Sequence, residues 1–219
     1  GFKEKASIQE PEVKYLGHFI SNGKRRIGPE RVEGIVSIPL PKTKQELRKF
    51  LGIAGYCRLW IDSYALVIKP LYLKITQEKP DPLLWTSEEL HQVEELKHLL
   101  ITASVLALPS LEKPFHLSVN INKGVALGVL TQEHGGHQQP MDLLSKVLDP
   151  VTVDGLNVSI IAATALLTKE SRKLTFGGKL AVSMPQQVRT ILIKSQEGGL
   201  LIENFKAVSY THLTLPTIY

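Results

Sequence analysis

Three residues spaced four apart, Arg48, Gly52 and Tyr56, could form one contact surface. On a helix, positions i, i+4 and i+8 follow the same face. An arginine reaches phosphates or polar edges, a glycine lets another molecule come close to the backbone, and a tyrosine ring packs against sugars. The three residues are therefore a candidate contact surface. The alternative is that Gly52 and Tyr56 only pack the helix against its neighbours.

A second candidate surface is basic. Its four residues are Lys14, Lys24, Arg25 and Arg26. Contacts from such side chains to phosphates carry most sequence-independent affinity for nucleic acid, although a solvated basic hairpin explains them almost equally well. The formal net charge of +5 and the pI of about 9.2 favour anionic partners, nucleic acid first, although many basic proteins bind none.

Patterns for catalysis and metal binding are missing from the sequence. No two aspartates are adjacent, and the single cysteine, Cys57, cannot form an internal disulfide. No Cys/His set has zinc-site spacing, and we expect no metal at the closest histidine pair, His134 and His137. The longest weakly polar run, 158–167, is far shorter than the roughly 20 residues of a membrane helix. We therefore expect no membrane span, and a reducing intracellular compartment fits best.

The first half of the chain contains signals for a hairpin and several helices. The β-prone run 13–20 precedes Asn22-Gly23, a pair that favours the positive φ angles of a tight turn, and the chain returns through 24–27. Pro29 begins a short helix to about Ser37. Two capping boxes predict longer helices, the first from 43 to about 60 and the second opening at 86. Residues 74–82 read as a polar loop.

The second half predicts a small α/β layer fold. We expect strands, a long helix, a further strand and a final helix, in the order 115–121, 125–132, 141–145, 159–173, 179–184 and 186–194. The boundary between the halves falls near Leu108.

Several blocks in this order resemble the polymerase polyprotein (Pol) of gammaretroviruses and related endogenous elements. They are Lys14-Tyr15-Leu16-Gly17, Leu47-Arg48-Lys49-Phe50-Leu51-Gly52, Gly55-Tyr56-Cys57-Arg58-Leu59-Trp60-Ile61, Gly128-Val129-Leu130-Thr131-Gln132, Leu144-Ser145-Lys146 and Leu148-Asp149-Pro150. The resemblance runs from about residue 11 to about 195.

The resemblance implies an α+β fold: an end-of-palm β-hairpin and an α-helical thumb, followed by a ribonuclease-H-like α/β connection domain. Residues 1–30 would be the C-terminal hairpin of the palm, called the primer grip. Residues 31–107 would be the helical thumb and linker, and 108–207 the connection domain. The string 208–217 resembles one reading frame of a sequencing-library adaptor, so we expect 208–219 to be a non-native tail, with a divergent C-terminus as the alternative.

The same resemblance implies that this chain lacks catalytic centres. The family's paired metal-binding aspartates lie in the palm, upstream of Gly1, and a start at Gly1 rather than Met suggests an internal fragment. At the positions of the ribonuclease H carboxylates the chain carries Asn120, Ser159 and Pro185, which cannot replace three metal-binding acids. We therefore expect no cofactor in this fragment, whereas the parent enzyme would use Mg²⁺.

The implied function is to grip a template–primer duplex, RNA–DNA or DNA, as part of an RNA-directed DNA polymerase (reverse transcriptase). The thumb stripe would follow the minor groove, while Lys14, Tyr15 and Gly17 would belong to the primer grip. The implied partners are this duplex and the remainder of the Pol polyprotein. The location would be cytoplasmic, or the virion of an intact virus. The alternatives are a stand-alone nucleic-acid-binding remnant and a relic without function.

Overall fold

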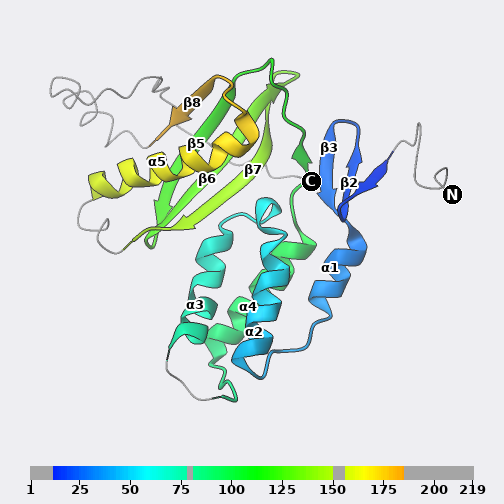
Figure 1. Cartoon of the computed structure of the whole chain (residues 1–219), viewed down its shortest axis with the longest axis vertical. Helices are drawn as coiled ribbons and strands as arrows, with labels where there is room; N and C mark the ends of the chain where they lie inside the picture. The colour runs from blue at the N-terminus through cyan, green and yellow to red at the C-terminus, as the bar shows by residue number, and fades with distance from the viewer. Residues whose placement is uncertain (1–11, 78–80, 150–155, 185–219) are drawn as a thin grey trace.

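The computed structural model of the chain describes residues 12–77, 81–149 and 156–184. The predicted helix at 186–194, Pro185 and the tail at 208–219 lie outside this part. Figure 1 shows a bundle of helices with a sheet above it and a small sheet beside the two. The mixed α+β class predicted from the sequence is confirmed. The domain boundaries predicted from the sequence stay predictions.

The small sheet is built from short antiparallel strands. They are β1 (Val13–Tyr15), β2 (His18–Ser21), β3 (Lys24–Ile27) and the later β4 (Leu106–Ala107), in that order. The turn at Asn22-Gly23 is confirmed, with φ of 48° and 70°. The predicted single strand 13–20 is wrong, because Leu16 and Gly17 also have positive φ values, 48° and 81°, and form a second tight turn.

The bundle contains helices α1 (Pro29–Val36), α2 (Lys44–Gly55), α3 (Tyr64–Thr76) and α4 (Ser87–Ile101). The capping box that opens α4 is complete. At α2, Thr43 accepts from Glu46 N as predicted, but the Glu46 carboxylate accepts from Lys42 N instead. The predicted end of this helix at Trp60 is wrong. The helix tightens after Gly55 and continues as a 3₁₀ turn, η2 (Arg58–Trp60), which carries Trp60 into the core.

Helix α3 was not predicted, and the loop after it begins at Gln77 rather than Lys74. Pro70 lies inside α3, where proline removes one backbone hydrogen bond. The helix persists because one side of it is buried, including Val67, Ile68 and Leu71. Packing of this kind outweighs local propensity in most protein helices.

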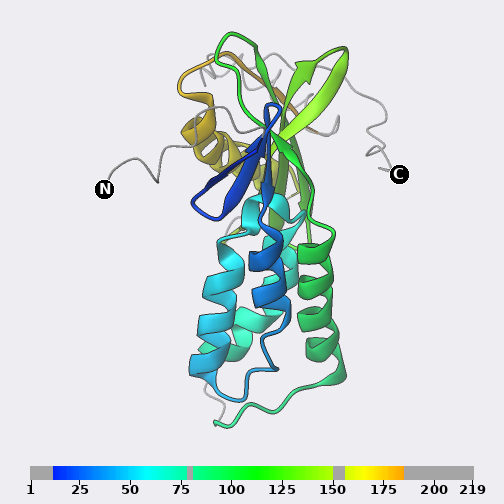
Figure 2. The same cartoon turned by 90° about the vertical axis from the view of Figure 1, so that its right-hand side faces the viewer.

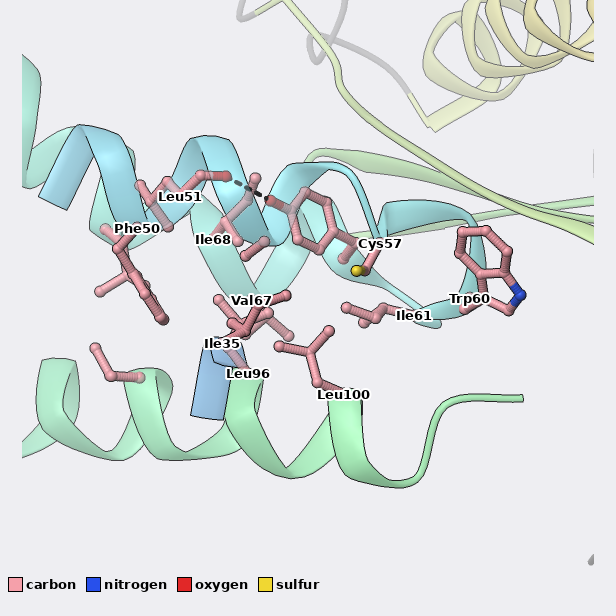
Figure 3. Packing of buried hydrophobic residues seen from close by; sticks show 14 of the residues in the cluster. Ile35, Phe50, Leu51, Cys57, Trp60, Ile61, Val67, Ile68, Leu96 and Leu100 are labelled. Atoms are coloured by element: carbon pink, nitrogen blue, oxygen red, sulfur yellow. Dashed lines mark hydrogen bonds between the residues drawn. The ribbon is translucent and has the colours of Figure 1, made fainter. Parts of the chain in front are cut away.

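A continuous hydrophobic core holds the bundle together. Phe50 and Leu51 of α2 face Leu96 and Leu100 of α4, and all four are at most 1% exposed (Figure 3). Burying one such side chain stabilises a fold by about 1.5–3 kcal/mol. Cys57 lies in the same core, in the turn between α2 and η2, and burial raises the pKa of its thiol to about 11. This cysteine is therefore a protonated core residue near neutral pH.

The larger sheet forms the second half. Its elements are β5 (Phe115–Asn122), β6 (Val125–His134), β7 (His137–Val147), α5 (Leu156–Thr175) and β8 (Leu180–Ser183). The strand order is β7-β6-β5-β8, antiparallel except for the parallel pair β5–β8 that α5 connects. At Gly128 a Cβ would lie 2.9 Å from Leu167 Cδ1, so a larger residue there would force the Leu167 side chain of α5 to shift. The predicted α/β layer is confirmed, with longer strands.

Strand β7 joins the two halves. Leu143 belongs to the buried cluster of the bundle, although it lies in the sheet of the second half. The Ser145 hydroxyl accepts a hydrogen bond from Ala65 N of α3 at 2.9 Å. The two views show the sheet seated directly on the ends of the helices (Figures 1 and 2). The bundle and the sheet are thus packed against each other through side chains of β7.

Candidate nucleic-acid interface

The first two residues of the predicted stripe lie open on α2. Arg48 and Gly52 are both exposed, and within the described residues the Arg48 guanidinium has no hydrogen bond or ion pair. A Cβ added to Gly52 would meet no atom of the described residues within 4 Å. Packing within this part of the chain therefore does not require glycine at that position. A glycine in a helix interior instead destabilises the helix by roughly 0.5–1 kcal/mol relative to alanine.

Tyr56, the third residue of the stripe, contacts the small sheet. Its hydroxyl donates to the Leu16 carbonyl and lies 2.8 Å from His18 Nε2. The His18 ring stacks on the tyrosine ring at 5.1 Å with an interplanar angle of 17°, and the Arg31 guanidinium lies 4.1 Å from the same ring centre. Contacts within the protein thus hold the Tyr56 side chain, and its contact with a duplex stays a prediction. Its side chain remains 40% exposed beside the stripe.

The turn at Leu16-Gly17 presents exposed side chains next to the end of α2. Tyr15 is 59% exposed and Leu16 is 69% exposed. Gly17 has φ +81°, and a Cβ at this position would overlap the Arg31 guanidinium. Any other residue would therefore disturb both the turn and Arg31. The turn and the stripe, which lie about thirty-five residues apart in the sequence, meet through Tyr56.

The basic side chains differ in how firmly ion pairs with neighbouring carboxylates hold them. Lys14 forms an ion pair with Glu30, and both side chains are more than half exposed. Lys24 is exposed, with no ion pair among the described residues. Arg26 pairs with Glu12 at 2.9 Å and lies 4.7 Å from the Phe19 ring centre. The exposed Lys14–Glu30 pair is weak enough for a phosphate to compete with the carboxylate. Arg26 is held more firmly, because its Nε and Nη2 both donate to the Glu12 carboxylate.

Arg25 points into the junction between the small sheet and β7. Its Nη2 donates to the Met141 carbonyl at 2.7 Å, and the guanidinium lies 5.6 Å from the Trp60 ring centre. Trp60 Nε1 donates in turn to the Arg25 carbonyl at 3.4 Å. The predicted contact of Arg25 with a duplex stays a prediction. In the structure this side chain joins the small sheet to β7.

Asp142 is a buried acid beside Arg25, only 4% exposed. Burial raises the pKa of its carboxyl to about 6, although Arg25 and Arg58 act to lower it. In the unfolded chain an aspartate titrates near pH 3.9. Between about pH 4 and pH 6 the folded form keeps a proton that the unfolded form has released. The free energy of unfolding therefore falls as pH rises through this window, by up to about 3 kcal/mol.

The Asp142→Asn variant is expected to be more stable than the wild type at pH 7, because it removes the buried charge. The difference between the two should shrink toward zero near pH 4. Urea unfolding at pH 4, 5, 6 and 7 measures it, and Asp149→Asn, at an exposed aspartate, serves as the control. An Asn variant less stable than the wild type at pH 7 would show that attraction to the arginines outweighs burial.

The positions of the missing ribonuclease H acids do not form a metal site in the described residues. Asn120 is exposed on β5, and its Oδ1 accepts from Ile121 N at 2.8 Å. Ser159 is buried in the first turns of α5, and Pro185 lies outside the described part. No group of three or more His, Cys, Asp or Glu side chains there is placed to hold a metal ion. The residues present do not fit Mg²⁺, whose ligands are carboxylate oxygens.

Sequence reasoning missed His18 and Arg31. His18 lies in a β-prone run and Arg31 in a short helix, and neither spacing nor charge pattern links them to Tyr56. Their contacts arise only when the second turn at Leu16-Gly17 brings β2 against the end of α2. A signal was available in Leu16-Gly17, since a glycine inside a β-prone run often marks a bend.

The comparisons with known proteins agree with this architecture. Residues 85–169 match the family described as "RNase H-like domain found in reverse transcriptase". The chain is 44% identical over 190 residues to the Gag-Pol polyprotein of Avian reticuloendotheliosis virus, covering 86% of this chain and 16% of that protein. It is 40% identical over 215 residues to the Pol polyprotein of Feline endogenous virus ECE1, covering 98% and 20%. The chain is homologous to a segment of retroviral Pol polyproteins. The similarity predicted from the sequence blocks is confirmed.

Solved structures show the same fold. A foamy viral protease-reverse transcriptase in complex with double-stranded DNA superposes with a TM-score of 0.78 at 21% identity, over 92% of this chain and 38% of that one. The complex with an RNA/DNA hybrid gives a TM-score of 0.76, also at 21% identity, over 95% of this chain and 30% of that one.

The chain spans a fifth or less of the viral polyproteins cited above. Among the described residues no helix has the length and apolar character needed to cross a bilayer.

Proposed function

We propose that this Pol segment grips a template–primer duplex, RNA–DNA or DNA, as part of an RNA-directed DNA polymerase. In this proposal the segment itself performs no chemistry, and the ribonuclease-H-like layer is non-catalytic. Its partners are the duplex and the remainder of the polyprotein. It acts in the cytoplasm, or in the virion of an intact virus. The polymerase carboxylates and their Mg²⁺ belong to the parent protein.

The single observation that carries the proposal is that Gly52, with open space around it, shares an exposed face of α2 with Arg48, one turn earlier, whose charge no described residue pairs. A helical glycine with open space is a cost to the fold that no internal contact explains. A ligand that approaches the helix backbone closely would explain it. Arg48 extends the same exposed face with a charge that no described residue neutralises. The related viral enzymes whose structures hold nucleic acid duplexes support this choice of ligand.

The Gly52→Ala variant tests the proposal because its two expected effects have opposite signs. Alanine should raise the free energy of unfolding by about 0.5–1 kcal/mol. It should also weaken duplex binding about tenfold, equivalent to about 1.4 kcal/mol, since the new methyl group holds the duplex off the helix. Fluorescence anisotropy with a labelled RNA–DNA hybrid measures binding by the 219-residue chain, and urea unfolding measures stability.

Gly34→Ala is the matched control. Gly34 is also an exposed helical glycine whose added Cβ would meet no atom within 4 Å, but it lies on α1. This variant should gain similar stability and keep its affinity for the hybrid. Equal affinities of Gly52→Ala and Gly34→Ala for the hybrid would contradict the proposal that a duplex lies against Gly52.

In the same assay, Arg48→Ala should lower the slope of log affinity against log salt by about one, as one lost phosphate contact does.

A further inference from the structure

The hydroxyl of Tyr56 connects two groups of the small sheet and thereby fixes a tautomer. The Leu16 carbonyl can only accept, so the tyrosine must donate its one proton there. The 2.8 Å contact with His18 Nε2 then requires the histidine to donate. His18 is therefore in the form that carries its proton on Nε2. Its Nδ1 is buried and has no hydrogen-bond partner among the described residues.

The surroundings keep His18 neutral. Burial is the largest influence that lowers the pKa of its imidazole, and the positive charges of Arg25 and Arg31 lower it further. The imidazole also contacts the Trp60 ring, with centres 4.6 Å apart. His18 is thus held by ring contacts with Tyr56 and Trp60 as well as by its hydrogen bond. Such a constrained donor can define the position of the hydroxyl that it binds.

Arg31 supports the same arrangement from α1. Its guanidinium lies over the Tyr56 ring and fills the space beside Gly17 that a Cβ would otherwise occupy. Its Nε is buried and has no hydrogen-bond partner in the described residues. Three elements, the turn at Leu16-Gly17, the end of α2 and the start of α1, therefore converge on one tyrosine.

We propose that His18 and Arg31 are positioning residues that hold the Leu16-Gly17 turn at a fixed distance from the α2 stripe. The inference rests on the proposed function, in which the turn and the stripe touch one duplex at neighbouring places. Two contact surfaces of a protein strengthen each other's binding to one rigid ligand only when the distance between them matches the ligand. His18 and Arg31 set this spacing through Tyr56 and need not touch the duplex themselves.

The test compares variants that keep or remove the His18 donor. His18→Phe retains a flat ring and loses the hydrogen bond, whereas in His18→Gln the side-chain amide can still donate from the position of Nε2. Binding of the labelled hybrid is measured over a salt series with the 219-residue chain. His18→Phe should bind roughly fivefold more weakly with an unchanged salt slope, since no phosphate contact is lost. His18→Gln should restore most of the affinity.

Further variants separate positioning from direct contact. Tyr56→Phe should weaken binding at least as much as His18→Phe, because it removes the hydrogen bond to the Leu16 carbonyl as well as the one shared with His18. The double variant should be no weaker than Tyr56→Phe alone, because the shared hydrogen bond can be lost only once. Arg31→Met should also weaken binding at unchanged salt slope. A wild-type affinity in His18→Phe would overturn the inference, and a salt slope lowered by about one in Arg31→Met would make Arg31 a phosphate contact instead.

Amide hydrogen exchange separates failure of the inference from failure of the proposed function. Without any duplex, exchange at residues 16–18 should accelerate roughly tenfold in His18→Phe and remain near the wild-type rate in His18→Gln. If the wild type binds no duplex, the proposed function fails while the exchange rates still decide whether His18 holds the turn. Equal exchange in all variants would refute the positioning role.

Discussion

The Glu89→Ala variant is expected to lower the free energy of unfolding by about 3–5 kcal/mol. The reason is Lys74, whose side chain is only 3% exposed although it carries a charge. Its Nζ lies 2.6 Å from the Glu89 carboxylate, donates to the Leu84 carbonyl and lies 5.0 Å from the Trp85 ring centre. Removal of the carboxylate leaves a buried cation without its counter-charge.

The same carboxylate also caps helix α4. Its oxygen accepts from Thr86 N at 2.9 Å, which completes the capping box. Loss of a helix cap typically accounts for about 1 kcal/mol. The free energy is measured by urea unfolding followed by circular dichroism at pH 7. Glu95→Ala, at an exposed glutamate of the same helix, is the control and should change stability little.

A double variant identifies why Glu89→Ala lowers the free energy of unfolding. Lys74→Met combined with Glu89→Ala removes both charges, and should recover most of the stability that Glu89→Ala alone loses, because no buried charge is left unpaired. If the double variant is as unstable as the single one, the cap rather than the ion pair dominates. A loss below about 1 kcal/mol in Glu89→Ala would show that water reaches Lys74.

The Trp60→Ala variant should lose about 3–5 kcal/mol, the range for a buried tryptophan. Trp60 is 1% exposed and lies on η2, between the bundle and the larger sheet. It also contacts the small sheet, through His18 and the Arg25 carbonyl. Its removal therefore opens a cavity at the point where the parts of the chain meet. Urea unfolding followed by circular dichroism measures the effect.

Trp60→Phe provides the graded comparison. Phenylalanine keeps a ring but lacks the indole N–H and part of the volume, so a loss of roughly 1–2 kcal/mol is expected. Ile101→Ala is the control at a side chain 62% exposed. If Trp60→Ala resembled this control, the packing of η2 against β7 would contribute nothing to stability.

Short sequence patterns correctly predicted the elements whose start or turn depends on a few neighbouring residues. Thr86 and Glu89 predicted where α4 begins because a capping box involves only residues within one helical turn. Asn22-Gly23 predicted its turn because few other residue pairs tolerate two positive φ angles. The strands of the larger sheet followed from β-prone runs separated by glycine. In the candidate site, the stripe on α2 was predictable because helical spacing is fixed.

The errors occur where tertiary contacts override local preference. Helix α3 was not predicted; it contains Pro70, and its buried face stabilises it despite the proline. Trp60 ends up in a 3₁₀ turn because the core requires its ring, whereas helical periodicity alone extended α2 to it. His18 and Tyr56 are thirty-eight residues apart, so no local pattern relates them. Contacts of this kind require the fold itself.

The open glycine on α2 also bears on how this sequence changes over generations. At Gly52 a mutation to alanine is expected to stabilise the helix, because the added methyl group meets no atom of the described residues. A copy of the element that no longer has a role is free to accept that mutation, and gains stability by doing so. Under the proposed function, a copy that still grips a duplex is under selection against it. We therefore expect glycine at this position in working copies and a wider range of residues in copies without a role.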